Sequence, residues 1–279
     1  MRASEEPALD LHFVETLVRP DRRAALPEPL PGDAFVGGGS WLFSEPQTRL
    51  RRLIDLASFG WTPIEPRPEG LEIAATCRLA ELAAFEPVAG WPAASLFRPS
   101  CDALWGSFKI HNVATVGGNL CLGLPAAPMA ALATALQGVF LVWQPDGGDR
   151  LLAAIDFLTG PGETALRPGE ILRSVTLPAT ALRRRAAIRQ ASLTSHGRSA
   201  ALLIGTSDPG GAMSLTVTAA VRRPLRLDFR SPPDAAGLQA ALSQRLNPAV
   251  LFDDLHGSAD WKRHMTLRLA EDIRRELAA

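Results

Sequence analysis

A chain of 279 residues with 47% hydrophobic and 21% charged residues has the composition of an ordinary globular protein with one large domain or two to three smaller ones. Its 29 Lys and Arg balance its 29 Asp and Glu, which argues against nucleic acid or an anionic membrane as the main partner. No apolar run is long enough to span a membrane, and the polar, acidic first residues do not resemble a signal peptide, so we expect a cytoplasmic location.

The N-terminal part of the chain predicts short strands separated by loops. Residues 9–17 (LDLHFVETL) alternate in polarity and predict a strand. Residues 19–33 contain four prolines and predict a short helix followed by a loop. The buried strand expected at 34–36 then runs into the sequence GGGS at 37–40, and residues 49–56 end in an apolar, strand-like unit.

The middle of the chain predicts a mixture of strands and helices. A strand at 71–75 precedes a helix that Thr76 could cap, with Leu79 and Leu82 facing the core. Residues 92–108 read as mostly helical, and 111–119 (HNVATVGGN) as a polar, turn-rich segment.

The next helix, PMAALATALQG, should stop at Gly138. A short buried strand, VFLVW, follows it, and PDGGD then predicts a hairpin turn.

The character of the chain changes near residue 179, where the arginine-rich ALRRRAAIRQ begins. Two alternating runs joined by DPGG predict a β-hairpin. After Ser258, apolar residues recur every four positions and predict a docked amphipathic helix. These residues are Trp261, Met265, Leu269, Ile273 and Leu277.

Neither the cysteines nor the histidines predict a metal or catalytic site. Cys77, Cys101 and Cys121 have no C-x-x-C spacing and are too few for a four-cysteine zinc or iron–sulfur site, so we interpret them as structural thiols. His111 and His196 lie near the motifs described next, but each stands alone and is interpreted as structural.

Two glycine-rich segments share one pattern, in which apolar strand residues precede a glycine pair and a polar side chain. They are AFVGGGSWLF at 34–43 and ATVGGNL at 114–120. Glycine lets backbone N–H groups converge on one point, which favours binding of an anion such as a diphosphate. Neither segment is a G-x-G-x-x-G fingerprint or a P-loop, and each alone is explained more simply as an ordinary turn.

Five stretches in this order resemble the FAD-binding medium subunit of the molybdenum hydroxylase family, which includes carbon monoxide dehydrogenase and xanthine dehydrogenase type enzymes. They are FVGGGSWL, LEIAATCRLAEL, HNVATVGGNLCLGLPAAPMAALATAL, IDFLTGPGETALRPGEILRSVTLP and AIRQAS. The resemblance is clear over about residues 9–200 and less clear beyond. It implies an α+β fold: a two-lobed FAD-binding domain like that of vanillyl-alcohol oxidase over 1–178, with lobes at about 1–60 and 61–178. A smaller C-terminal α+β domain of the carbon monoxide dehydrogenase flavoprotein type would occupy 179–279.

The resemblance also implies which residues hold the cofactor. The first glycine-rich segment would wrap the FAD diphosphate with its backbone amides, and the second would lie on its other side. The implied cofactor-binding residues are Gly37, Gly38, Gly39, Ser40, Trp41, Leu42, Trp105, Thr115, Gly117, Gly118, Asn119, Leu172 and Arg189. No catalytic residue and no metal ligand is implied in this chain.

Three of these residues are implied to lie nearer the flavin ring. Trp105 would pack on the cofactor, although core packing explains it equally well. The backbone of Leu172 would lie by the ring. Arg189 replaces a lysine of relatives and would raise the flavin potential, unless it is a surface arginine.

The chain departs from the family pattern near the second segment. Pro128 stands where relatives carry an Asp that helps to hold the cofactor, and Leu124 replaces an Asp or Ser. The chain has no tyrosine, so an aromatic residue over the flavin would have to be Trp or Phe.

The function implied is that of an FAD-carrying electron-transfer subunit of an oxidoreductase complex. A large molybdenum-cofactor subunit would oxidise the substrate, and a small subunit with two two-iron iron–sulfur clusters would pass electrons to this FAD and on to an external acceptor. The whole could be a dimer of heterotrimers. Two alternatives remain: a scaffold subunit with weakened or lost FAD, and a free-standing FAD oxidoreductase.

Overall fold

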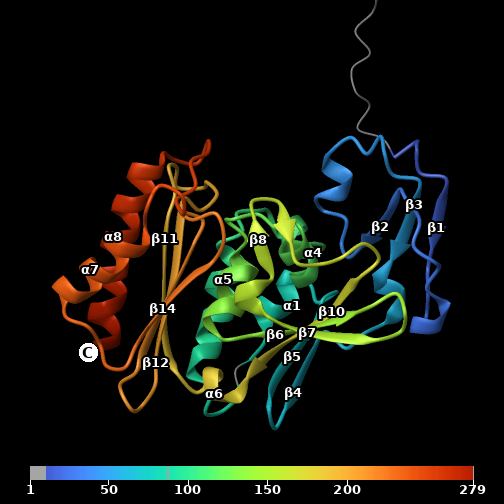
Figure 1. The fold of residues 1–279 in the computed structure, drawn as a ribbon. Helices are drawn as coiled ribbons and strands as arrows, with labels where there is room; N and C mark the ends of the chain where they lie inside the picture. Colours follow the sequence, from blue (N-terminus) through green and yellow to red (C-terminus); the bar gives the residue numbers. More distant parts are fainter. Residues whose placement is uncertain (1–10, 87, 279) are drawn as a thin grey trace, which may run out of the picture.

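The computed structural model describes residues 11–86 and 88–278, which form three larger sheets and one two-stranded sheet, with helices packed between and against them (Figure 1). The α+β fold class expected from the sequence is confirmed. In Figure 1 the N-terminal sheet lies on the right, a five-stranded sheet in the centre and a four-stranded sheet on the left.

The N-terminal sheet has three parallel strands in the order β1-β3-β2. They are β1 (Thr16–Val18), β2 (Asp33–Val36) and β3 (Arg52–Asp55). Strand β3 is central, and its Leu53 and Ile54 are buried. The strands expected at 34–36 and 49–56 are confirmed, as is a short helix, η1 (Arg23–Ala25), within 19–33.

The strand expected at 9–17 is wrong over most of its length. The first strand begins at Thr16, and the N–H of Val14 closes a turn on the carbonyl of Leu11 at 2.8 Å. Positions 9 and 10 lie outside the described residues. Alternation did not decide this element, because the strand exists only where Arg52 and its neighbours offer a parallel partner.

The central sheet is antiparallel, with the order β4-β5-β10-β6-β7. Its strands are β4 (Ile64–Arg67), β5 (Gly70–Ala74), β6 (Val139–Trp143), β7 (Asp149–Ala153) and β10 (Ile171–Pro178). The helices packed with it are α1 (Leu79–Ala84), α2 (Phe97–Asp102), α3 (Phe108–His111), α4 (Val116–Cys121) and α5 (Pro128–Ala135). The expected hairpin turn at PDGGD is confirmed between β6 and β7.

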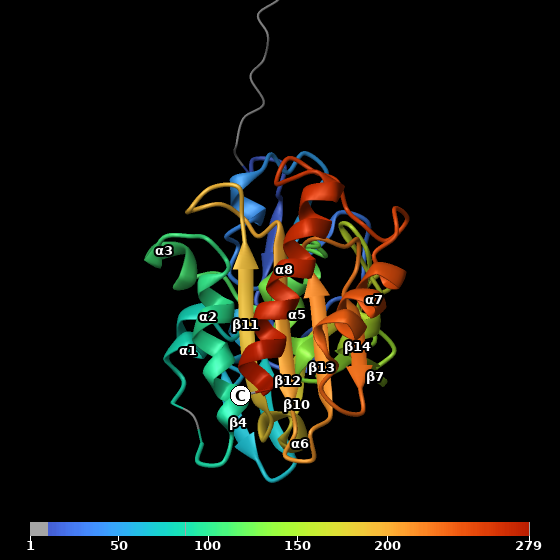
Figure 2. The ribbon, with the colours of Figure 1, turned by 90° about the vertical axis from the view of Figure 1, so that its left-hand side faces the viewer.

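The C-terminal sheet is an antiparallel meander in the order β11-β12-β13-β14, and two helices cover one face (Figure 2). Its elements are β11 (Arg185–Ala191), β12 (Ala201–Ser207), β13 (Met213–Thr218), β14 (Leu225–Phe229), α7 (Ala235–Arg245) and α8 (Ala259–Ala278). The DPGG hairpin and the C-terminal helix are confirmed, and the Ser258 hydroxyl accepts a hydrogen bond from the N–H of Trp261 at 3.3 Å.

Helix α5 lies between the central and C-terminal sheets, and small residues allow this close packing. All eight of its residues are buried. Leu202 and Ile204 of β12 belong to the same apolar cluster as the α5 side chains, so one core continues from the central sheet into the C-terminal sheet. The remaining elements are η2 (Leu42–Ser44), η3 (Leu56–Phe59), η4 (Pro92–Leu96), η5 (Ala154–Asp156), β8 (Leu158–Gly160), β9 (Glu163–Thr164) and α6 (Ala179–Leu182).

Three helix boundaries differ from the sequence expectation. Arg78, not Thr76, precedes α1, and its N–H donates to the carboxylate of Glu81 at 2.7 Å. Helix α5 ends at Ala135, and the left-handed residue after it is Gln137 (φ 53°) instead of Gly138. The helical stretch expected at 92–108 is interrupted between Asp102 and Phe108.

Candidate functional site

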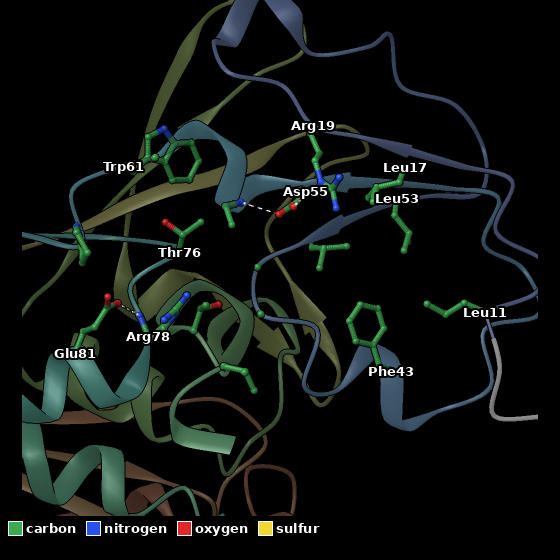
Figure 3. Close-up of a pocket in the computed structure, with 18 residues that line it drawn as sticks. Leu11, Leu17, Arg19, Phe43, Leu53, Asp55, Trp61, Thr76, Arg78 and Glu81 are labelled. Atoms are coloured by element: carbon green, nitrogen blue, oxygen red, sulfur yellow. Dashed lines mark hydrogen bonds and ion pairs between the residues drawn. The ribbon is translucent and has the colours of Figure 1, made fainter. Parts of the chain in front are cut away.

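A cleft of about 620 Å3 separates the N-terminal sheet from the central sheet, and both glycine-rich segments reach it (Figure 3). Its walls come from the ends of β2 and β3, from the connection to β4, and from the starts of α1 and α4. Its size is typical of a small-molecule site. The predicted residues that line it are Gly37, Gly38 and Thr115.

The first glycine-rich segment follows β2, which an ion pair anchors to β3. The guanidinium of Arg52 donates to both carboxylate oxygens of Asp33, at 2.8 and 2.7 Å. These hydrogen bonds hold the pKa of Asp33 below its ordinary value. The segment therefore leaves the sheet from a fixed strand end.

The backbone N–H groups of residues 37–42 make no hydrogen bond within residues 11–86 and 88–278. Gly39 takes a left-handed conformation (φ 71°), and a Cβ there would lie 2.3 Å from the ring of Phe43. A Cβ on Gly37 would lie 2.6 Å from the Thr115 hydroxyl. The first segment thus presents a run of free donors, and only glycine fits where it touches the second segment.

The second glycine-rich segment is the start of helix α4, not the turn-rich loop expected. Its backbone donors are used inside the protein: the N–H of Val116 donates to Cys77, that of Gly117 to Ala75, and those of Gly118 and Asn119 to the side chain and carbonyl of Thr115. This segment therefore offers a ligand the Thr115 hydroxyl proton and side-chain amide hydrogens, but not the backbone amides of 116–119.

Two predicted residues of this segment have structural roles. A Cβ on Gly117 would lie 2.5 Å from the Cβ of Ala75, so Gly117 allows α4 to pack on β5. The side-chain oxygen of the buried Asn119 accepts from the N–H of Met129 at 3.0 Å and so caps α5. Gly118 is exposed, and the atom nearest to a Cβ there would be the Thr115 hydroxyl at 2.9 Å.

Pro128 occupies the first position of α5 and is buried. A proline is favourable there because its missing N–H would have no intrahelical partner. Helix α5 thus starts with a residue that brings no carboxylate to this position.

The two predicted tryptophans both contact the loop between β11 and β12. The ring of Trp105 stacks on His196, with centroids 4.2 Å apart and planes at 19°. The guanidinium of Arg198 lies 5.6 Å from the ring centre of Trp41. The C-terminal sheet therefore reaches over the first glycine-rich segment through this loop.

Leu172 and Arg189 do not line the cleft. Leu172 is buried in the central core and pairs with Val142 of β6. The guanidinium of Arg189 lies 2.5 Å from the carboxylate of Glu276 on α8.

Charged and aromatic residues that sequence reasoning missed also line the cleft, namely Arg19, Asp55, Trp61, Arg78 and Glu81. Arg19 and Asp55 form a 3.6 Å ion pair. Two of these residues lie at the ends of secondary-structure elements: Asp55 is the last residue of β3, and Arg78 directly precedes α1. Neither residue belongs to a local sequence motif that would mark it as a binding residue.

No group of three or more His, Cys, Asp or Glu that could hold a metal ion occurs within 11–86 and 88–278. Cys77 and Cys101 are buried, and burial raises the pKa of the Cys101 thiol to about 12. Cys121 is exposed. None of the helices in the described part of the chain combines the length and apolar character needed to cross a bilayer.

The arrangement fits a ligand with a diphosphate group. Gly37 and Gly38, whose backbone N–H groups are free within the described residues, line the cleft together with Thr115, and apolar side chains such as Leu17, Leu53 and Trp61 line it as well. No nucleophile–base pair of catalytic type lines the cleft among the described residues.

Comparison with known proteins places this chain in one family. Residues 23–180 match the family model described as the FAD binding domain in molybdopterin dehydrogenase. Because this match covers more than half of the chain, the chain belongs to the family of FAD-binding domains found in molybdopterin dehydrogenases.

In sequence, the chain is similar to a part of a larger enzyme and to a part of a separate subunit. It is 32% identical over 123 residues to xanthine dehydrogenase of Oryza sativa subsp. japonica, covering 42% of this chain and 9% of the rice protein. It is 26% identical over 165 residues to the aldehyde oxidoreductase FAD-binding subunit PaoB of Escherichia coli, covering 57% of this chain and 50% of that subunit.

A solved structure of Cu,Mo-CO dehydrogenase shares the fold, with a TM-score of 0.81 at 22% identity over 94% of this chain and 96% of the other. The matched segments thus span half or less of the two curated relatives, whereas the fold extends over nearly the whole chain.

Proposed function

We propose that this chain binds FAD in the cleft and serves as the FAD-carrying electron-transfer subunit of a molybdenum hydroxylase complex. The observation that carries the proposal is the run of backbone N–H groups at residues 37–42 that make no hydrogen bond within the described residues. Gly37 and Gly38 of this run line the cleft, and the run lies inside the family-matched segment. Backbone donors held in this way stabilise a diphosphate without a lysine.

The residues proposed to hold FAD follow from this geometry. Residues 37–42 would donate to the diphosphate, and the Thr115 hydroxyl would donate from the opposite wall. Trp41 and Trp105 lie under the loop that joins β11 to β12 and would border the flavin end. FAD supplies the redox chemistry when bound, while this chain binds it, orients it and limits its exposure to water.

The partners proposed are a large molybdenum-cofactor subunit and a small iron–sulfur subunit, from which electrons reach this FAD and pass to an external acceptor. The family match and the absence of a metal-ligand cluster from the described residues support this division of labour. Similarity to the FAD-binding subunit PaoB favours a multi-subunit enzyme over a free-standing oxidoreductase.

The experiment is to purify the tagged chain from its own cells together with whatever remains bound to it. We expect a flavin absorption band, release of FAD on denaturation, and iron and molybdenum in the same fraction. A complex that contains both metals and no flavin would instead identify a scaffold subunit. Two features favour that second function: the backbone donors of 116–119 are already used, and Pro128 stands where the family resemblance implies an acidic residue.

A further inference from the structure

We propose that Arg78 is the cation that pairs with the diphosphate of the bound dinucleotide. This inference rests on the proposed function, because it assigns a residue to the same cleft. Arg78 lines the cleft with Gly37, Gly38 and Thr115, and in Figure 3 its side chain extends from the start of α1 toward the centre of the cleft.

Backbone pairing fixes Arg78 beside Thr115. The N–H of Leu79 donates to Ala114 at 2.9 Å, and that of Val116 donates to Cys77 at 2.8 Å. These bonds make Arg78 and Thr115 directly opposed residues that exchange no hydrogen bond, a geometry in which the Cα atoms lie about 4.5 Å apart and the side chains share one face. The Arg78 side chain therefore leaves the backbone on the same face as the side chain of Thr115, which meets Gly37.

The other charges of the cleft already have partners. Arg19 pairs with Asp55 at 3.6 Å, and the Glu81 carboxylate accepts from the backbone N–H of Arg78 at 2.7 Å. Within residues 11–86 and 88–278, the Arg78 guanidinium itself makes no ion pair or hydrogen bond. It is the cation of the cleft that remains available to an anion.

A charge on this wall would add to the backbone donors of the first glycine-rich segment, because the second segment supplies no backbone donors of its own. The N–H groups of 116–119 are bonded inside the protein, so the first segment would face the diphosphate without matching amides opposite. A planar guanidinium donates in parallel to two phosphate oxygens, and such charge-assisted bonds are stronger than neutral ones. Arg78 thus completes the anion site from the wall that carries Thr115.

The test compares the parent chain with Arg78→Gln and Arg78→Lys, each freed of any bound flavin and titrated with FAD and with ADP. We expect Arg78→Gln to weaken both ligands about tenfold to a hundredfold and to flatten the dependence of affinity on KCl. Arg78→Lys should recover part of the loss. The matched control is Arg223→Gln, at an exposed arginine outside the cleft, which should bind like the parent.

Unchanged FAD and ADP affinity in Arg78→Gln, or a loss with the salt dependence of the parent, would overturn the assignment. A parent that binds ADP but not FAD would refute the flavin function while the ADP titrations still decide the role of Arg78. A parent that binds neither ligand would overturn both proposals.

Discussion

Gly38 packs directly against the backbone of Val113, the residue that precedes the second glycine-rich segment. A Cβ on Gly38 would lie 1.5 Å from the carbonyl oxygen of Val113 and 2.6 Å from its carbon. Both neighbours are backbone atoms that cannot swing aside as a side chain would, so any other residue at position 38 must push the segments apart. The glycine is thus required by packing within the protein, before any ligand is considered.

Gly38→Ala should therefore lower both stability and flavin affinity. Forced separation of two packed segments costs about 1–3 kcal/mol, as overpacking does elsewhere, and it moves the free N–H groups of 37–42 away from Thr115. Thermal unfolding and an FAD titration of the same preparation measure the two effects.

Gly118→Ala is the comparison variant. The nearest atom to its new Cβ would be the Thr115 hydroxyl, at 2.9 Å, so this substitution crowds the hydroxyl without pushing the two segments apart. Under the proposed function it should keep the unfolding temperature of the parent within a few degrees and still lose FAD affinity. Parent-like FAD binding in Gly118→Ala would remove this glycine from the cofactor site.

Much of the fold could be predicted because neighbouring residues in the sequence determine the elements concerned. The C-terminal helix shows its four-residue apolar period, and the DPGG hairpin its turn residues. The first strand and the start of α1 could not be predicted in this way. Strand β1 depends on pairing with β3. The start of α1 depends on backbone pairing of Arg78 with Thr115, a residue distant in the sequence.

The functional site, like the fold, could be predicted only where its conformation depends on residues close in the sequence. Glycine type and spacing predicted that segment 37–42 would present backbone donors, since its conformation is local. Whether the donors of Val116 and Gly117 are free depends on Cys77 and Ala75, about forty residues away in the chain, so no local pattern could reveal it. Arg78 was missed because a single arginine before LAEL has no signature until the fold brings it to Thr115.

The stability of the C-terminal helix should depend on pH through Glu271. Hydrogen bonds from Arg274, and then from Arg275, lower the pKa of Glu271 from an ordinary 4.5 to about 2. The folded state thus binds this proton more weakly than the unfolded state, so the stabilisation is complete above pH 4.5 and is lost as pH falls toward 2.

Glu271→Gln removes the titrating group and should flatten unfolding free energy against pH over that window. Denaturant unfolding at a series of pH values measures it. Parallel curves for parent and variant would show that the Arg274 and Arg275 contacts do not stabilise the charged form.

Lys262 is a fully buried cation, and it should make the C-terminal part sensitive to loss of its partner. Its ammonium lies 2.8 Å from the carboxylate of Asp254 and near the ring of Phe252. Asp254→Ala would leave the charge buried and unpaired, a loss that costs about 3–5 kcal/mol in buried pairs.

Lys262→Met removes the buried charge itself. It should therefore lower the unfolding free energy less than Asp254→Ala does, although Lys262 is the more deeply buried residue of the pair. Urea unfolding of the two variants compares them, and a larger loss for Lys262→Met than for Asp254→Ala would contradict the argument.

The last prediction concerns Arg189, which the family resemblance implies to lie beside the flavin. On β11 the side chains alternate: Ala187 packs in the cluster that contains the α8 residues, whereas Ile188 packs against the central core. Arg189 lies on the α8 side, where its guanidinium pairs with Glu276. Both side chains are more than one-third exposed, so the pair is worth at most about 1 kcal/mol.

We therefore expect Arg189→Ala and Glu276→Gln each to leave the flavin potential unchanged, with weak coupling in a double-mutant cycle. Redox titration of the FAD-loaded chain measures this. A lower potential in Arg189→Ala, without the same change in Glu276→Gln, would mean that Arg189 leaves Glu276 for the flavin when FAD binds, and the electrostatic role implied by the sequence would then hold.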